Sequence, residues 1–151
     1  MDTLDTKALS FLMQNGRATW AELGEHLGLS APSAAERVRK LEEAKVITGY
    51  TALLDSAAMG YPLTAFIFVT LASQRDRNAF LRAISKMPQI VEAHHVAGDD
   101  DYLLKARCRT TGDLDDLLAK QLKQKLGIAR TRTTIVLATA KETVHIPIAQ
   151  D

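Results

Sequence analysis

The segment "TWAELGEHLGLSAPSAAERVRKLEE" limits the possible folds of this chain more than any other. Thr19 is followed three residues later by Glu22, which is the spacing of a capping box at a helix start. Gly28 suits the left-handed turn that ends many helices. Ser30 can cap a second helix, with Pro32 in its first turn, where a missing N–H costs little. Two helices joined by a short turn containing glycine predict a helix-turn-helix motif.

A further helix precedes this motif. Apolar residues recur at helical spacing over residues 4–15, "LDTKALSFLMQN". Asp2 or Thr3 can cap its start, and Gly16 is expected to end it. The first 50 residues therefore predict a small three-helix domain.

The helix that begins at Ser30 has two different faces. A helical wheel places Ala34, Val38 and Leu41 on one stripe, which is expected to pack inward. The outward stripe contains Ser33, Glu36, Arg37 and Lys40, with Arg39 at its side. A basic stripe that starts with a small hydroxyl residue suits the major groove of DNA. Ser33 and Arg37 are near enough to the leading end to reach base edges, and Ser30, Arg39 and Lys40 can hold phosphates.

Charge alone does not decide whether these residues bind DNA. The whole chain has a net charge of +1, and residues 1–50 carry six Lys/Arg against seven Asp/Glu, a net charge of −1. A DNA-binding surface must therefore concentrate its positive charge on one face, and a solvated helix face is the alternative interpretation of the three cations. Glu36 has two interpretations as well: it can accept a hydrogen bond from a cytosine amino group, or it can pair with Arg39 or Lys40 at helical spacing.

Residues 62–142 follow a β-α-β-β-α-β order. "LTAFIFVTLA" is typical of a buried strand, and "RDRNAFLRAISKM" of an amphipathic helix. "IVEAHHVA" and "DYLLKARC" form a hairpin through "GDD", followed by the helix "TGDLDDLLAKQLKQKLG" and the strand "IARTRTTIVLATA". This is the ferredoxin-like order, so the fold class is α+β. Two helices on one sheet face leave the other face uncovered, and its apolar residues suggest that a second subunit covers it.

Other features exclude several classes of protein. The longest apolar run falls far short of the roughly 18 residues of a membrane span, and the N-terminus is polar, so we expect a cytoplasmic protein. Cys108 is the one cysteine and is expected in the core. His94 and His95 are adjacent on a strand and point to opposite faces, so they cannot share a metal ion. We expect no metal site, no catalytic residues and no cofactor.

The chain resembles the Lrp/AsnC family of regulators, also called feast/famine proteins. The resemblance covers nearly the whole chain and is carried by "LDTKALSFLMQNGR", "LGLS", "ERVRKLEEAKVITGYTALLD" and "VAGDDDYLL", in this order and spacing. It implies a winged helix-turn-helix domain over residues 1–50 and a linking strand or hinge over residues 51–61. It further implies a ferredoxin-like domain over residues 62–151 that binds an effector and oligomerises. "KVITGYTALLD" supplies a turn and a β segment for the wing.

The resemblance also implies site residues. Those for DNA are Ser30, Ser33, Arg37, Arg39 and Lys40, with Thr48 and Tyr50 in the wing. Those for an effector are Gly98, Asp99 and Asp101, with Thr134 on the last strand; His95, just before this loop, is a further candidate for lining the pocket. Asp100 stands where the family usually has an aromatic residue, and Glu36 where many members are basic.

The resemblance implies a small-molecule effector, an amino acid. A carboxylate such as Asp101 can pair with an ammonium group, and backbone N–H groups around a glycine turn can bind a carboxylate. Three adjacent aspartates repel one another, however, and a cationic ligand or a metal ion relieves that repulsion. This favours lysine or arginine as the effector. Without the family, the "GDDD" run is interpreted as a hairpin turn.

The predicted function is that of a sequence-specific transcriptional regulator that binds double-stranded DNA. The resemblance implies homodimers that assemble into octamers and an amino acid bound at subunit interfaces. Two alternatives remain open at this stage. One is an enzyme similar to siroheme decarboxylases, which have a similar layout; the other is an oligomer partner of a related regulator that does not itself bind DNA.

Overall fold

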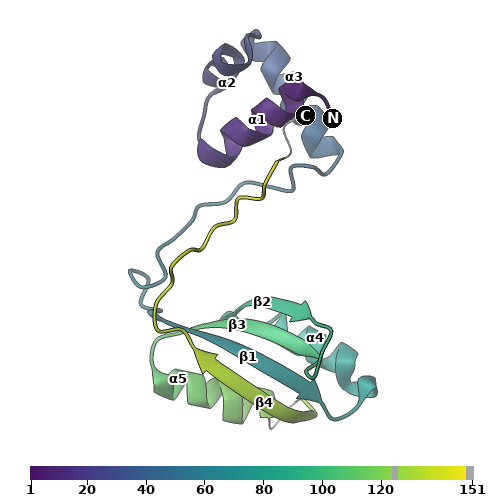
Figure 1. Cartoon of the computed structure of the whole chain (residues 1–151), viewed down its shortest axis with the longest axis vertical. Coiled ribbons are helices and arrows are strands. Elements are labelled where there is room, and N and C mark those ends of the chain that lie inside the picture. The colour runs from purple at the N-terminus through teal and green to yellow at the C-terminus, as the bar shows by residue number, and fades with distance from the viewer. Residues whose placement is uncertain (124–125, 149–151) are drawn as a thin grey trace. The chain divides into compact units, whose positions relative to one another are not determined.

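The computed structural model describes residues 1–123 and 126–148. The chain forms two compact units: Met1–Ala52 together with the C-terminal segment that begins at Lys141, and Leu53–Ala140 (Figure 1). The C-terminal segment differs from the prediction, since it groups with the first unit: Val144, Ile146 and Pro147 line a cavity beside the first helix. Within the described residues, no helix is long and apolar enough to span a membrane.

Three helices form the first unit: α1 (Thr3–Gln14), α2 (Trp20–Leu27) and α3 (Ala31–Glu43). Their caps are those predicted from the sequence. Asp2 caps α1, Thr19 and Glu22 form a capping box on α2, and the Ser30 side chain accepts from the Ser33 N–H at the start of α3. The fully or nearly buried core consists of Ala8, Leu23, Leu27, Ala34 and Val38. The predicted inward stripe of α3 is therefore confirmed.

The turn between α2 and α3 is tight. Gly28 ends α2 with a φ of 68°, in the left-handed region that favours glycine. The Leu29 N–H donates to the carbonyl oxygen of Gly24 at 2.8 Å, which folds the turn back onto α2. A Cβ atom at Gly24 would lie 2.7 Å from the Leu29 carbonyl oxygen and 3.2 Å from the Ala31 nitrogen. The close approach of the two helices thus depends on the absence of a side chain at Gly24.

The prediction of a β segment after α3 is wrong for this chain. No strand is formed between residues 44 and 62, which are all described. A strand needs a neighbouring strand to accept and donate its backbone hydrogen bonds, and this segment has none within the chain. At its far end the Asp55 carboxylate accepts from the N–H groups of Ala57 and Ala58 and closes a turn.

The second unit has the predicted ferredoxin-like order. Its strands are β1 (Leu63–Leu71), β2 (Ile90–His95), β3 (Tyr102–Cys108) and β4 (Ile128–Ile135), paired antiparallel in the order β2-β3-β1-β4 (Figure 1). A short 3₁₀ turn (Gln74–Asp76) leads into α4 (Arg77–Ile84). Helix α5 (Thr111–Asp116) is capped by Thr110 and continues as a wider π-helical stretch (Leu117–Lys123).

Both helices cover the same face of this sheet. Alternate residues of β1, from Ala65 to Leu71, are buried against Phe80 and Ile84 of α4 and against the leucines of α5 and its extension. Cys108 belongs to this core, and burial raises the pKa of its thiol, as the charge of Asp113 does to a smaller extent.

The opposite face is more charged than predicted. Residues directly opposite each other on paired strands share a face. The register therefore places Phe66 and Phe68 beside Lys105, Arg132 and Thr134. Arg132 stacks on the Phe68 ring at 3.9 Å from its centroid, and Lys105 pairs with Glu92 of β2 at 2.9 Å. The open face is a mixture of aromatic residues and ion pairs, not an apolar surface.

Candidate functional site

Helix α3 presents its N-terminal end to solvent. Ser30 and Ser33 are both exposed, and their hydroxyl oxygens lie 2.8 Å apart. The Ser33 N–H donates to the Ser30 oxygen at 3.3 Å, so the cap fixes the start of the helix. Small hydroxyl side chains at the start of a helix allow the phosphate backbone or the base edges of DNA to approach closely. Two small, exposed hydroxyl side chains therefore mark the start of α3.

Arg39 and Lys40 are exposed and share an acidic neighbour. The Arg39 guanidinium donates to Glu36 at 2.9 and 2.6 Å and also pairs with Glu43, and the Lys40 ammonium lies 3.8 Å from Glu36. The hydrogen bond from Arg39 lowers the pKa of Glu36. These contacts agree with the interpretation in which Glu36 pairs with Arg39 and Lys40. Ion pairs this exposed contribute little to stability, and their members can be exchanged for other partners.

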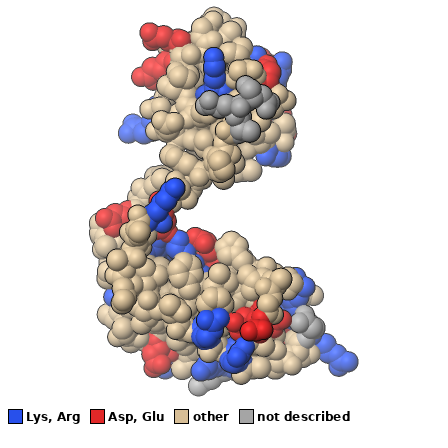
Figure 2. Space-filling view, viewed as in Figure 1, with Lys and Arg blue, Asp and Glu red and all other residues tan. Residues whose placement is uncertain are grey.

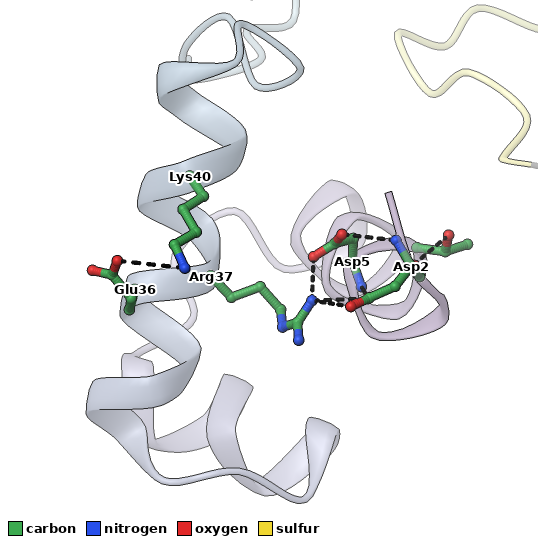
Figure 3. A network of polar contacts seen from close by, with 6 residues as sticks. Asp2, Asp5, Glu36, Arg37 and Lys40 are labelled. Carbon is green, nitrogen blue, oxygen red and sulfur yellow. Dashed lines mark hydrogen bonds and ion pairs between the residues drawn. The ribbon is translucent and has the colours of Figure 1, made fainter.

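Arg37 does not share this outward direction. Its guanidinium extends from α3 to the first turn of α1, where it lies 2.7 Å from Asp2 and 2.5 Å from Asp5 (Figure 3). Glu36 and Lys40 contact each other on a different side of α3. The predicted common stripe of Ser33, Glu36, Arg37 and Lys40 is therefore wrong at Arg37, because α1 packs beside α3 at that point and supplies two carboxylates.

The two wing candidates are part of the first unit. Thr48 and Tyr50 line a cavity of about 1120 Å³ together with α1 and the C-terminal segment. The Tyr50 hydroxyl donates to Glu42 at 2.8 Å, and burial together with this bond raises the pKa of Tyr50 to about 12. Neither residue lies in a strand.

The loop between β2 and β3 contains the predicted effector residues and is held against β1. Gly98 has a φ of 142°, which a residue with a side chain rarely adopts. The Asp101 N–H donates to the Val69 carbonyl oxygen at 2.9 Å, and the Asp101 carboxylate accepts from the Leu71 N–H at 2.8 Å. The Asp101 carboxylate is thus partly used in fixing the loop.

Asp100 has internal cationic partners. Its carboxylate is buried and lies 3.2 Å from both Arg130 and Arg132 of β4, and it accepts from the Thr70 hydroxyl at 3.1 Å. Burial alone would raise the pKa of Asp100, but the hydrogen bonds from Arg132 and Thr70 and the charges of both arginines lower it overall. The predicted need for a cationic effector or a metal ion is therefore corrected: the chain itself neutralises the most buried aspartate of the run.

Both arginines were missed in the sequence, although a signal for them was present. Arg130 and Arg132 alternate along β4, so a strand places both side chains on one face. Residues 1–123 and 126–148 contain no group of three or more His, Cys, Asp or Glu residues that could hold a metal ion.

His95 and Thr134 are not brought together. His95 pairs with the buried Tyr102 and its ring lies 5.2 Å from the Tyr102 ring, on the side of the sheet that carries the helices. Thr134 pairs with Phe66 on the open face. A single subunit therefore cannot place both side chains in one pocket.

The Asp100 cluster leads to a pH-dependent prediction. A carboxyl group whose pKa is lower in the folded state stabilises the fold above its ordinary pKa of 3.8, and that contribution is lost as the pH falls through the folded value. Asp100→Asn should therefore lower the melting temperature at neutral pH, and the difference from the unsubstituted protein should shrink below about pH 4. Scanning calorimetry from pH 7 to pH 3 measures this. A difference that stays constant with pH would contradict the charge assignment.

Charged groups are mixed over the visible surface. Lys and Arg side chains lie next to Asp and Glu side chains on the face drawn in Figure 2, without one continuous basic area. This agrees with the net charge of +1. Any attraction to DNA must therefore come from particular groups, such as those of α3.

Comparison with known proteins identifies a family for both parts of the chain. Residues 1–42 match the model of the AsnC-type helix-turn-helix domain, and residues 64–146 match that of the Lrp/AsnC ligand binding domain. The leucine-responsive regulatory protein of Rhizobium meliloti is 38% identical over 150 residues, covering 98% of this chain and 96% of that protein. The HTH-type transcriptional regulator FL11 of Pyrococcus horikoshii is 34% identical, covering 98% and 97%.

Solved structures agree with this. A transcriptional regulator of Neisseria meningitidis, crystallised as a complex with L-Met, has a TM-score of 0.94 at 30% identity and covers 97% of this chain and 96% of its own. AsnC of Escherichia coli has a TM-score of 0.90 at 29% identity, covering 97% and 99%. The chain is a member of the Lrp/AsnC family of transcriptional regulators.

Proposed function

We propose that this regulator binds double-stranded DNA through α3, with Ser30 and Ser33 at the leading end and Arg39 and Lys40 on the phosphates. The observation that carries the proposal is the geometry of α3: a serine-capped, exposed N-terminal end, followed by two exposed cations about two turns beyond Ser33. The N-terminal residues of a recognition helix contact base edges, whereas lysine and arginine along it hold the backbone.

Energetics support the assignment of Arg39 and Lys40 to phosphates. Their carboxylate partners are exposed, so little stability is lost when the cations leave them. Binding to phosphates also releases counterions from DNA, which favours the exchange at low salt.

The test of DNA binding is selection of bound duplexes from a random double-stranded pool, run with and without a mixture of the twenty amino acids. We expect enrichment of a palindromic motif with half-sites about one helical turn, roughly 10 base pairs, apart. No enrichment under either condition, from protein shown to be folded, would overturn the proposal. The decarboxylase alternative receives no support from the relatives described above, which are named as transcriptional regulators.

We further propose that an amino acid is the effector and that it binds at the loop from Gly98 to Asp101. The N. meningitidis regulator and a feast or famine regulatory protein of Mycobacterium tuberculosis were both crystallised with L-methionine. Because Asp100 is neutralised by Arg130 and Arg132, we expect an effector with an uncharged side chain rather than lysine or arginine.

The effector site is proposed to be completed by another subunit. His95 and Thr134 lie on opposite faces of the sheet, so a pocket that uses both needs two copies of the chain. Homodimers that assemble further, up to octamers, would bring such faces together. Sedimentation velocity measures the assembly, with and without the effector.

Isothermal calorimetry with each of the twenty amino acids tests the effector assignment. Binding of one or more uncharged amino acids is the expected result, with loss of binding in Asp101→Asn. Binding of lysine or arginine alone would contradict the role given to Arg130 and Arg132.

A further inference from the structure

The contact between Arg37 and the start of α1 differs in kind from the other ion pairs of α3. The Arg37 side chain is 24% exposed and that of Asp5 is 16% exposed, whereas Asp2, Arg39, Glu36 and Glu43 are 47 to 58% exposed. One nitrogen of Arg37, Nη1, meets both carboxylates: it lies 2.8 and 2.7 Å from the two oxygens of Asp2 and 2.5 Å from an oxygen of Asp5. The Arg37–Asp5 pair is partly buried, so breaking it costs more than breaking the exposed pairs of Arg39.

Asp2 and Asp5 also hold the first turn of α1 together. Asp2 caps α1 by accepting from the Asp5 N–H, and the Asp5 carboxylate accepts from the Asp2 N–H, each at 2.8 Å (Figure 3). The carboxylates that define the first turn of α1 are therefore also the partners of Arg37. Helix α3 is joined to α1 at a fixed point, halfway along the proposed DNA-binding helix.

We infer that Arg37 is a positioning residue that stays on α1 when α3 binds DNA, and that Asp2 and Asp5, by withholding this cation from phosphates, set the ratio of operator affinity to random-DNA affinity. The inference rests on the proposed function of α3. Under this inference, two acidic residues that do not touch DNA control the ratio of operator affinity to random-DNA affinity. A cation released from such a pair adds affinity for any phosphate backbone but carries no sequence information.

The first test is the double variant Asp2→Asn/Asp5→Asn, which removes the charge and keeps the cap, because asparagine caps helices as well as aspartate does. Binding to the selected operator and to a random duplex is measured by fluorescence anisotropy from 50 to 300 mM salt. The released Arg37 should add one phosphate contact, so the slope of log K against log[salt] should steepen by about 0.9. Random-duplex affinity at 0.15 M salt should rise roughly fivefold and the operator-to-random ratio should fall.

Glu25→Gln is the control; it removes one carboxylate charge, whereas the aspartate variant removes two. Glu25 is an exposed carboxylate on α2 and, in the described residues, forms no ion pair with a cation of α3. Its loss changes the net charge of the same unit but releases no cation, so the salt slope should stay unchanged. An equal change of slope in Glu25→Gln and in the aspartate variant would overturn the inference.

The second test is Arg37→Gln. A positioning residue predicts weaker operator binding with an unchanged salt slope, since no phosphate contact is lost. A slope reduced by about 0.9 would make Arg37 a phosphate contact and overturn the inference. Circular dichroism confirms that each variant is folded. Failure of the unsubstituted protein to bind any duplex would overturn the proposed function instead, so the two failures are distinguishable.

Discussion

Gly24→Val is expected to abolish DNA binding and to unfold the first unit at temperatures where the second unit stays folded. A Cβ atom at residue 24 meets the Leu29 carbonyl oxygen at 2.7 Å and the Ala31 nitrogen at 3.2 Å. Both are backbone atoms of the turn, so they cannot move without separating α2 from α3. Overpacking of this kind costs about 1 to 3 kcal/mol or more, and a branched side chain adds to the conflict.

The smaller substitution, Gly24→Ala, is the more discriminating test, because the expected change in stability has the opposite sign to the usual effect of alanine in a helix. Alanine inside a helix is usually more stabilising than glycine, by about 1 kcal/mol. Gly24→Ala is expected to destabilise in spite of that gain, because its Cβ alone produces the contact. Gly16→Ala is the control, since the nearest atom to a Cβ there is 3.9 Å away. Urea unfolding followed by circular dichroism measures both; a Gly24→Ala protein as stable as the unsubstituted one would contradict the description of the turn.

Arg39→Ala/Lys40→Ala is expected to lower DNA affinity roughly 30-fold at 0.15 M salt and to reduce the salt slope by about 1.8, the equivalent of two phosphate contacts. The loss should be the same for operator and random DNA, because phosphate contacts carry no sequence information. Alanine favours helices, so α3 itself should remain formed.

The control for this variant removes two positive charges elsewhere. Arg82 and Lys86, at the end of α4 and just beyond it, are exposed. Arg82→Ala/Lys86→Ala should leave the salt slope unchanged if α3 carries the phosphate contacts. Titration of fluorescent duplexes at several salt concentrations measures both variants. An unchanged slope in Arg39→Ala/Lys40→Ala would contradict the proposed interface.

Local signals in the sequence predicted the parts of the fold that depend on neighbouring residues. The Thr19–Glu22 capping box, the Ser30 cap and the left-handed turn at Gly28 are all present. Each involves atoms within a few residues of one another, so the sequence spacing determines it. The ferredoxin-like order was predictable for a similar reason, since alternating and helical periods mark strands and helices directly.

Contacts between distant residues were not predictable in this way. A helical wheel shows that Arg37 is off the buried stripe, but it does not show that α1 lies there with Asp2 and Asp5. The partners of Asp100 come from β4, which the hairpin sequence does not contain. The expected wing strand is not formed, because a strand needs a neighbouring strand to pair with its backbone. The apolar pattern of one segment does not show whether such a neighbour exists.

The central claim is that α3 lies in the groove of DNA with Ser33 at its leading end, and cleavage of DNA from that position tests it most directly. Cys108 is buried, so a thiol-reactive iron chelate should modify Ser33→Cys alone, and the unsubstituted protein serves as the unlabelled control. On the selected operator we predict two clusters of cleavage, one in each half-site, about one helical turn apart. Cleavage spread evenly along the duplex, or none from a labelled protein that binds, would contradict the claim.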